Sequence, residues 1–522
     1  MGLISLAATT PNALAQIAGE TDLVAFQTEV SEEEALEAGV VGTHTLRFSR
    51  VAIDPELLRL PGPEDAPPGT WLNTGGSHAI EPFGGERYTV RGRRVEASDD
   101  GTWSWVGQVE GYERGDFVFS VNGEQVYGTL RAGPVTLEFQ TGDDGWHYVR
   151  EPDVDAYGGC AHTGEGHEHE IGAPHRRARS PAPSLPAGVS PSRTVDVLLL
   201  YSPAVAGRYD IATLVNNAAA SMNTAFAESG VDAAVRIVHY HEVSGYTEPN
   251  PMHPIFHVLG LASIIQGNFS PFGNVAQLRT DHDADLVHML FDASKSPDAC
   301  GWAYYIADPA GDDYQFVSVG GDECISAQNV FAHEVGHNLG GGHDVGIETE
   351  AVPFGYSHGF TRKSPVRRTI LGSGDCVMGS CTRLNRWSSP NIYVNVDPMG
   401  DVNQADMVSS LDVTVPAVAD YYTPNAQTPG TPQTVDVESG QCYDLNWLTW
   451  TAATGTVGWY EVQSSVQSNF AVTFDVYRGP PQALLALSAS QTTYVRARAC
   501  NSASCSSWAN SASPATYTNG CL

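Results

Sequence analysis

Residues 333–344 contain side chains whose types and spacing can bind and use a metal ion. They read His-Glu-Val-Gly-His-Asn-Leu-Gly-Gly-Gly-His-Asp, with the pattern H-E-x-x-H-x-x-G-x-x-H. Because a helix turns by about 100° per residue, His333 and His337 lie one turn apart on the same face. Gly340 tolerates the positive φ at which a helix ends, so His343 can return to the same ion.

This arrangement predicts a catalytic zinc site. Structural zinc sites are closed and usually rich in cysteine, whereas three neutral imidazoles leave a fourth position open. Zn²⁺ held by His333, His337 and His343 lowers the pKa of a water molecule, and Glu334 can take the proton as general base. The alternative is a chance match, which the glycine and the third histidine at fixed offsets make much rarer.

The motif resembles the metzincin signature, and the aspartate after the third histidine resembles the adamalysin/reprolysin branch. The resemblance covers residues 193–424 and includes residues 284–290, 300–304 and 382–391. It implies a secreted bacterial type of zinc metalloendopeptidase with an α/β catalytic domain, a mixed sheet and an active-site helix. By the same resemblance, Gly301, Trp302 and Ala303 belong to an edge strand that pairs with substrate backbone.

Metzincins carry a methionine in a turn beneath the zinc. Met378, in the sequence Cys-Val-Met, matches the adamalysin form and is the favoured candidate. The alternative is the turn at residues 368–371, which has Leu371 at the expected position. The methionine does not bind zinc, so either assignment leaves the predicted chemistry unchanged.

Composition limits the partners of the chain. Its 522 residues include 60 acidic and 27 basic ones, giving a net charge of −33. Nucleic acids and anionic membranes need basic patches, so neither is expected as a partner. No apolar run is long enough for a transmembrane helix. Protein or peptide substrates remain the expected partners.

The cysteines indicate an oxidising compartment. Eight of the nine fall into two groups of four, and spacing does not fix their connectivity. Neighbouring pairs are compatible with disulfides: Cys300–Cys324, Cys376–Cys381 and Cys505–Cys521, with Cys442–Cys500 remaining. We therefore expect a secreted protein. Residues 1–19 resemble the tail of a secretory signal, and a frayed N-terminus is the alternative.

Residues 20–157 alternate in the manner of β-strands. Residues 117–121 and 124–130 flank Asn122-Gly123, which predicts a hairpin with a type I′ turn. A β-rich domain ahead of a protease is typically a prodomain that keeps the enzyme as a zymogen. An unrelated binding module is the alternative.

Residues 158–192 have the composition of a flexible linker. A Cys160 thiolate could occupy the open zinc position as a cysteine switch. The alternative is an unpaired or intermolecular cysteine. The Arg-Arg-Ala-Arg cluster at residues 176–179 suits proteolytic activation.

The catalytic region, residues 193–424, is predicted to alternate strand and helix. Residues 194–201 form an apolar strand and residues 211–229 an amphipathic helix. Ser326 is a plausible N-cap of the active-site helix. Five aspartates could hold Ca²⁺, although a solvated acidic face fits them better: Asp281, Asp283, Asp285, Asp312 and Asp313.

A Pro/Thr-rich linker at residues 425–434 leads to short alternating strands at residues 435–522. Their spacing predicts a β-sandwich, and they look like a fibronectin type III domain. Such a module could bind a surface or a polymer.

The sequence thus favours a secreted zinc endopeptidase. Two alternatives are a non-catalytic extracellular binding or adhesion protein on a metzincin scaffold and a zinc hydrolase of non-peptide substrates. A non-catalytic binding protein would be marked by the loss of Glu334 or of a histidine ligand. Glu334 and all three histidines are present.

Overall fold

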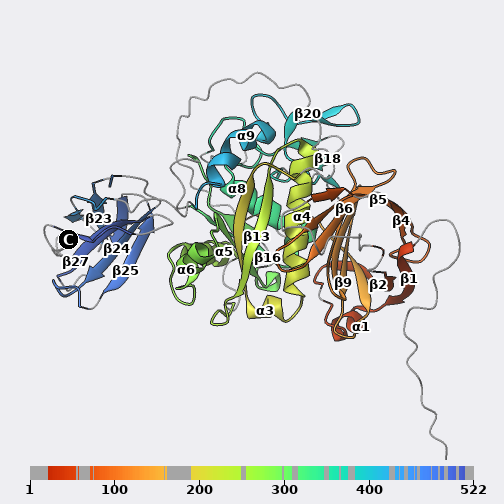
Figure 1. The fold of residues 1–522 in the computed structure, drawn as a ribbon, viewed down its shortest axis with the longest axis horizontal. Coiled ribbons are helices and arrows are strands. Elements are labelled where there is room, and N and C mark those ends of the chain that lie inside the picture. Colours follow the sequence, from red (N-terminus) through yellow and green to blue (C-terminus); the bar gives the residue numbers. More distant parts are fainter. Residues whose placement is uncertain are drawn as a thin grey trace, which may run out of the picture.

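In the computed structural model, the chain forms an N-terminal β barrel, a central α/β unit and a C-terminal pair of small sheets (Figure 1). The structure describes residues 22–511 except 41, 55–56, 58–70, 74–75, 158, 161–189, 249–253, 297–298, 309–314, 346–351, 364–365, 374–381, 423–429, 434, 440–444, 452, 455–458, 472, 480–481, 487–491 and 501–504. The proposed signal remnant, most of the linker and its arginine cluster therefore lie outside the described residues.

The N-terminal unit is a closed sheet. Its elements are β1 (Asp22–Val30), α1 (Glu32–Glu37), β2 (Thr45–Ile53), β3 (Trp71–Asn73), β4 (Ser77–Ile80), β5 (Tyr88–Ala97), β6 (Trp103–Val109), β7 (Asp116–Asn122), β8 (Gln125–Ala132), β9 (Val135–Thr141) and β10 (His147–Pro152). The strand order is β3-β5-β4-β1-β2-β10-β9-β8-β7-β6, and β5 also pairs with β6. This last pairing closes the barrel, which the strand pattern alone did not predict.

The predicted hairpin is confirmed, but its turn lies one residue further along the chain. Asn122 pairs with Gln125, so Gly123 and Glu124 occupy the two central turn positions. Gly123 has a φ of 62°, whereas Glu124 is not among the residues with positive φ. A type I′ turn needs positive φ at both positions, so the type I′ prediction is wrong. Glycine at the first central position is typical of a type II′ turn.

The central unit is built on a six-stranded sheet. Its strands are β11 (Gly159–Cys160), β12 (Thr194–Tyr201), β13 (Ala234–Glu242), β14 (Leu286–Phe291), β15 (Ala299–Ala303) and β16 (Val317–Gly321), in the order β11-β15-β16-β14-β12-β13. β13, β12, β14 and β16 run parallel, and β15 is antiparallel to β16. The predicted apolar strand is confirmed as β12, whose Leu198, Leu199 and Leu200 are fully buried.

Helices pack on this sheet. They are α3 (Pro203–Ala206), α4 (Ile211–Ser229), α5 (Pro254–Gln266), α6 (Val275–Asp281), the 3₁₀ helix η2 (Ala293–Lys295), α7 (Cys324–Ala327) and α8 (Val330–Asn338). The predicted helix at residues 211–229 is confirmed as α4. The Asp210 side chain caps its start, and Gly230, with a φ of 75°, ends it. α4 is buried on almost all sides because it lies between the central sheet and the barrel (Figure 1).

Shorter elements follow the active-site helix. They are β17 (Thr361–Lys363), β18 (Val366–Arg368), β19 (Thr382–Arg383), β20 (Ser389–Val394), β21 (Asp397–Met399) and α9 (Met407–Val418). Among the described residues, no helix is both long and apolar enough to cross a membrane.

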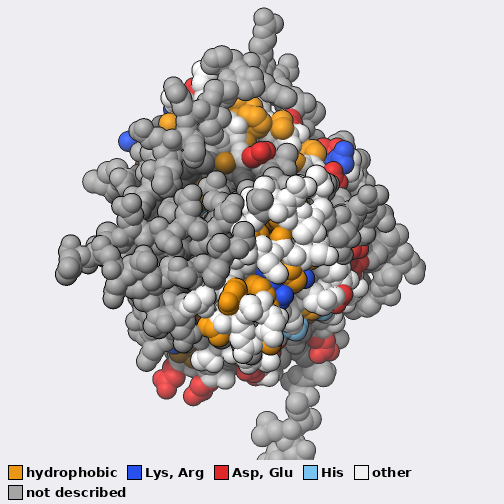
Figure 2. Space-filling view, turned by 90° about the vertical axis from the view of Figure 1, so that its left-hand side faces the viewer, with side chains coloured by type: hydrophobic (Ala, Val, Ile, Leu, Met, Phe, Trp, Pro, Cys, Tyr) orange, Lys and Arg blue, Asp and Glu red, His pale blue; other side chains and the backbone are white. Residues whose placement is uncertain are grey.

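The C-terminal unit consists of two antiparallel sheets. One has the order β22-β23-β26 and the other β25-β24-β27-β28. Their bounds are β22 (Val435–Ser439), β23 (Leu445–Trp450), β24 (Trp459–Ser465), β25 (Phe474–Gly479), β26 (Gln482–Ala486), β27 (Tyr494–Cys500) and β28 (Ala509–Asn510). On β27, Arg496 and Arg498 lie over the Trp508 ring at 4.5 and 4.4 Å. Figure 2 faces this end of the molecule and shows Lys or Arg side chains beside hydrophobic ones.

His288 is a buried core histidine that couples the stability of the central unit to pH. Its Nδ1 lies 2.8 Å from Ser318 Oγ, and its ring packs edge-on against Phe331 of α8. Burial lowers the pKa of His288 to about 3. The folded state therefore holds the ring neutral where the unfolded chain, with a pKa of about 6.5, would protonate it.

We expect this histidine to promote acid unfolding. Its contribution is fully present above about pH 6.5 and is lost as the pH falls towards 3, at about 1.4 kcal/mol per pH unit. In His288→Gln, the free energy of unfolding should fall less steeply between these limits. Urea unfolding at a series of pH values measures the slope, and equal slopes for the two proteins would contradict the expectation.

Candidate metal centre

The helix that carries the motif begins later than predicted. Ser326 lies in the separate short helix α7, and α8 begins at Val330 after Asn329. Asn329 has a φ of 54°, so the chain kinks between the two helices. The prediction that Ser326 caps the active-site helix is therefore wrong. Its hydroxyl instead lies 2.9 Å from the Thr129 hydroxyl of the barrel, a contact that local sequence cannot reveal.

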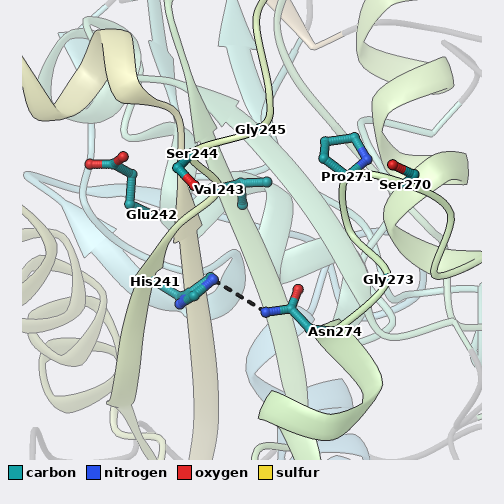
Figure 3. Close-up of a pocket in the computed structure, with 9 residues that line it drawn as sticks. All are labelled: His241, Glu242, Val243, Ser244, Gly245, Ser270, Pro271, Gly273 and Asn274. Atoms are coloured by element: carbon teal, nitrogen blue, oxygen red, sulfur yellow. Dashed lines mark hydrogen bonds between the residues drawn. The ribbon is translucent and has the colours of Figure 1, made fainter.

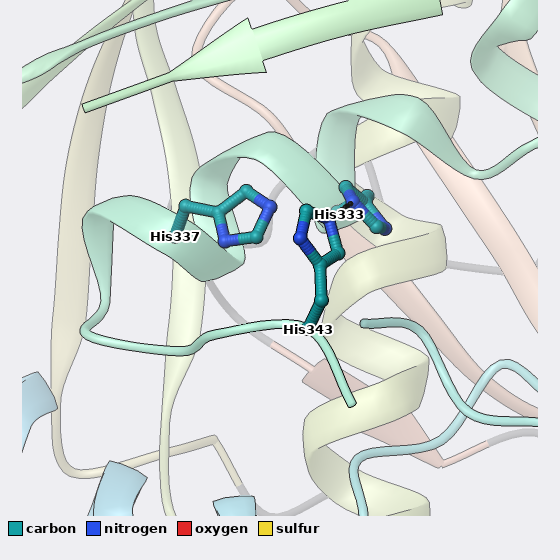
Figure 4. A group of neighbouring side chains, drawn as sticks. All are labelled: His333, His337 and His343. Carbon is teal, nitrogen blue, oxygen red and sulfur yellow. Dashed lines mark hydrogen bonds between the residues drawn. The ribbon is translucent and has the colours of Figure 1, made fainter. Parts of the chain in front are cut away.

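The structure brings the three predicted histidines together. His333 and His337 project from α8, and His343 comes from the loop that follows it (Figure 4). One ligand nitrogen from each lies within 4.8 Å of the other two, and His333 Nε2 is 3.1 Å from His343 Nε2. All three side chains are buried. Among the described residues, this is the one group of three His, Cys, Asp or Glu side chains that could hold a metal ion.

Backbone carbonyls orient the two helical histidines. His333 Nδ1 donates to Ile370 O, and His337 Nδ1 donates to Gly341 O, both at 2.7 Å. A carbonyl oxygen can only accept, so each ring carries its proton on Nδ1 and keeps the Nε2 lone pair for a metal. Gly340 ends the helix with a φ of 83°, as predicted, and this turn brings His343 back.

Glu334 is fully buried on α8 and lies against β15. A methyl group on Gly301 would stand 2.5 Å from Glu334 Oε1 and 2.7 Å from Val319 O. The glycine therefore lets the strand approach the carboxylate closely. The resemblance to metzincins predicted that Gly301 pairs with substrate backbone. The structure shows in addition that Gly301 lies against Glu334.

We expect Gly301→Ala to lower kcat/KM for a peptide substrate by about 100-fold. The methyl group would displace the Glu334 carboxylate, and errors of about 1 Å in such a group can have effects of this size. Gly355→Ala is the matched control because nothing lies within 4 Å of the added methyl group. An alanine variant at position 301 with unchanged kcat/KM would show that the carboxylate has room to move.

The strand β15 is not a free edge, contrary to the prediction for residues 301–303. On one side it pairs with β16, and on the other it pairs in parallel with β11, where Cys160 is in register with Gly301. Trp302 and Ala303 are buried in the sheet. The chain after the barrel thus covers the backbone groups that a substrate was expected to use.

The disulfide Cys300–Cys324 is present and joins β15 to α7, with Cα atoms 5.8 Å apart. Cys505 is also disulfide-bonded. The other predicted pairs include cysteines outside the described residues, namely Cys376, Cys381, Cys442 and Cys521.

Met378 also lies outside the described residues. Among the described ones, Leu371 and Met407 pack beneath the motif, and both would meet a methyl group placed on Gly341. Leu371 directly follows Ile370, whose carbonyl holds His333. The turn at residues 368–371, considered as an alternative, therefore supports the histidines.

Tyr305 and Asp344 have site contacts that the motif did not assign. The Tyr305 hydroxyl is 3.4 Å from His337 Nε2 and 3.3 Å from His343 Nδ1. Asp344 accepts hydrogen bonds from Thr361 Oγ1 and from the Ser373 amide, fixing the loops behind the site. The position of Asp344 after the third histidine was a signal in the sequence, but Tyr305 had none.

The aspartates considered for calcium do not converge in the described part of the chain. Asp285 is buried and accepts hydrogen bonds from the Asp196 and Tyr422 amides at 2.8 and 3.1 Å. Asp312 and Asp313 lie outside the described residues.

A separate hollow of about 380 Å³ lies at the end of β13. Figure 3 shows His241 there, with Nε2 3.3 Å from Asn274 Nδ2, and Ser270 and Pro271 on the opposite side of the hollow. None of its nine lining residues belongs to the three-histidine centre.

A twisted sheet above a helix with two histidines, and a third histidine returning from a glycine turn, are typical of a metallopeptidase domain. Residues 209–344 match the family model described as metallo-peptidase family M12B, reprolysin-like. This stretch of the chain is therefore similar to a reprolysin-like metallopeptidase domain.

Several known proteins are similar to this chain. A peptidyl-Asp metalloendopeptidase of Stenotrophomonas maltophilia (strain R551-3) is 27% identical over 343 residues, which are 62% of this chain and 78% of the relative. A protein of the same name from Xanthomonas campestris pv. campestris is 30% identical over 41% of this chain and 48% of its own length. The solved metalloproteinase-II from Bacteroides fragilis aligns with 54% of this chain and 86% of its own, at a TM-score of 0.33 and 11% identity.

Proposed function

We propose that the protein is a secreted, zinc-dependent endopeptidase. The observation that carries this proposal is the convergence of His333, His337 and His343 beside a buried Glu334. The donor set suits zinc because all three ligands are imidazoles, and in two of them Nδ1 points at a carbonyl oxygen, which leaves Nε2 for the metal. When bound, zinc acidifies water and polarises a carbonyl group.

The protein's own residues would do the rest. Glu334 takes a proton from the attacking water and later delivers it to the leaving amine. The Tyr305 hydroxyl, next to His337, can donate a hydrogen bond to the oxygen of the scissile carbonyl as negative charge develops there. The backbone of β15, once freed from β11, offers a peptide substrate a strand to pair with.

We propose further that the chain is made as a zymogen with residues 20–157 as prodomain. The pairing of Cys160 with Gly301 supports this, because it holds the cysteine beside the strand that contacts Glu334. A Cys160 thiolate would then block the metal centre. Cleavage at the arginine cluster of residues 176–179 would cut the covalent link between this segment and the catalytic unit, so that Cys160 could leave the metal centre.

The named activity of the relatives suggests cleavage beside aspartate, and two arginines support it. Arg368 on β18 and Arg383 on β19 are register partners. Arg368 lies two residues before Ile370. Within the described part of the chain, both Nε atoms are buried without a hydrogen-bond partner. Burial lowers the pKa of Arg368 to about 10, so it stays charged at neutral pH and could attract a substrate carboxylate.

Three further assignments concern the Met-turn, the C-terminal unit and calcium. We propose Met378 as the Met-turn residue, and residues 435–522 as a fibronectin type III-like module that binds a surface or a polymer. Arg496 and Arg498 of β27, which lie over the Trp508 ring, would suit such a ligand. Calcium binding by the aspartates near residue 283 has no further support in the contacts described.

Hydrolysis of casein, and of paired peptides that differ only by Asp or Asn, tests the proposal. The protein should be trimmed after Arg179 and assayed with and without a zinc chelator. We expect cleavage that the chelator abolishes and added zinc restores, with the aspartate peptide preferred. A folded, zinc-loaded, trimmed protein that cleaves neither substrate would favour a binding protein on this scaffold instead.

A further inference from the structure

We infer that the N-terminal barrel is a docking partner for the polar face of α4 and for residues 323–329. We further infer that it stays bound there as a separate chain after the linker is cut. This proposal concerns the interface alone and holds whether or not the protein is a peptidase.

The face of α4 that meets the barrel is polar. It carries Asn216, Asn217, Ser221, Asn223 and Thr224, all of which are buried. A helix at the surface of a domain normally turns such a face to water. Here the barrel strands β6, β7 and β8 cover it, as Figure 1 shows for α4 and β6. The face is therefore built for a polar partner rather than for the core of the central unit.

Asn217 makes a full set of hydrogen bonds with the barrel. Its Nδ2 donates to Val118 O and to Tyr127 O, each at 3.0 Å. Its Oδ1 accepts from Thr129 Oγ1, also at 3.0 Å. These bonds use both donors of the amide and contact backbone carbonyls of β7 and β8. A side chain satisfied so completely across two units marks a specific docking position.

Buried charges match across the same interface. Arg131 of the barrel bonds Asp116 and also donates to Ser221 Oγ of α4, each at 3.1 Å. Asp116 in turn lies 3.5 Å from the fully buried Arg386 of the central unit. Arg386 also pairs with Glu228 at the end of α4. Each charge thus has a partner of opposite sign, as binding in a desolvated interface requires.

The barrel also holds the segment that leads into the active-site helix. The Thr43 amide and hydroxyl donate to Glu323 at 2.7 and 2.6 Å. The Ser326 hydroxyl lies 3.1 Å from that of Tyr127, and Gln328 donates to Val154 O at 2.6 Å. The docking surface therefore extends from α4 to the beginning of α8.

The composition of the interface indicates two folded units in contact. The barrel has its own core, which includes Phe117, Phe119 and Phe139. In contrast, a small apolar cluster joins the two units through Val106, Val118 and Ala220. Interfaces between separate folded chains combine polar and apolar contacts in this way. None of these contacts involves the linker, so cutting it leaves them in place.

The test uses the full chain with Glu334→Gln to prevent self-digestion and a site-specific protease sequence in place of residues 176–179. After cleavage, the two fragments are run on a size-exclusion column at about 1 µM, a concentration at which a specific interface of ordinary size stays formed. We expect them to elute together in equal amounts. Separate elution of the two folded fragments would overturn the proposal.

Variants then test whether this surface is responsible. Asn217→Asp replaces the donating NH₂ group with an oxygen, which repels the carbonyl oxygens of Val118 and Tyr127. The dissociation constant of the two fragments should therefore rise at least about tenfold. Asn403→Asp makes the same change at an exposed position and should have no effect. Equal dissociation constants for these two variants would overturn the proposal.

A milder variant covers the case in which Asn217→Asp fails to fold. Thr129→Val, on the barrel, keeps the shape of the side chain but loses the hydroxyl that bonds Asn217 and Ser326. We expect it to weaken the cut complex about three- to tenfold while the intact chain keeps its circular dichroism spectrum. An unchanged dissociation constant here would count against the proposed surface.

Discussion

Replacing Glu334 with Gln is expected to lower kcat/KM by about 10,000-fold, the upper end of what general acid–base groups contribute. The amide has nearly the same shape as the carboxylate, so the packing of α8 against β15 should be kept. It cannot accept a proton, so both the activation of water and the protonation of the leaving amine would be lost. The measurement is hydrolysis of a fluorogenic peptide by the trimmed protein.

Zinc content separates this effect from loss of the metal. Glu334 is not among the three proposed ligands, so the variant should bind one zinc ion per chain as the parent does. Glu242→Gln, at the exposed end of β13, is the matched control and should keep full activity. Activity within tenfold of the parent in Glu334→Gln would mean that another group serves as the base.

The second large effect concerns Trp387, which joins α4 to α8. Its ring is 1% exposed and stacks on Phe226 of α4, with centroids 5.5 Å apart. A methyl group on Gly336 of α8 would stand 3.0 Å from the same ring. The Trp387 amide also donates to Ser229 Oγ at 3.0 Å. The side chain thus supports the helix that carries two of the three histidines.

We expect Trp387→Ala to lower the free energy of unfolding by about 3–5 kcal/mol, because it removes a large buried ring and leaves a cavity between two helices. Phe269→Ala is the control, since Phe269 is 41% exposed and its loss should change the stability by only about 0.5 kcal/mol. Urea unfolding followed by fluorescence and circular dichroism measures both. A Trp387→Ala chain as stable as the control would show that the neighbouring side chains close the cavity.

The sequence alone predicted the elements whose signals are local. The histidine spacing, Gly340 and the bounds of α4 depend on residues within a few helical turns, and periodicity and capping residues report such relations directly. The hairpin of β7 and β8 was found for the same reason. Its turn type was wrong because Asn122 pairs with Gln125, which places Gly123 and Glu124 at the centre of the turn.

Tertiary structure decided the relations between distant segments. α8 begins at Val330 and not at Ser326, whose hydroxyl contacts that of Thr129, 197 residues away in the sequence. β15 lost its free edge because residues 159–160 pair with it. The sequence predicted an amphipathic helix at residues 211–229, and in the structure the barrel buries the polar face of this helix as well.

The sequence by itself thus determined the cluster of three histidines, because one helical turn places His333 and His337 together and a glycine returns His343. Only the tertiary structure decided what surrounds that centre. Tyr305, Gly301 and Leu371 reach it from segments whose approach depends on sheet pairing and packing, and no local pattern encodes such contacts.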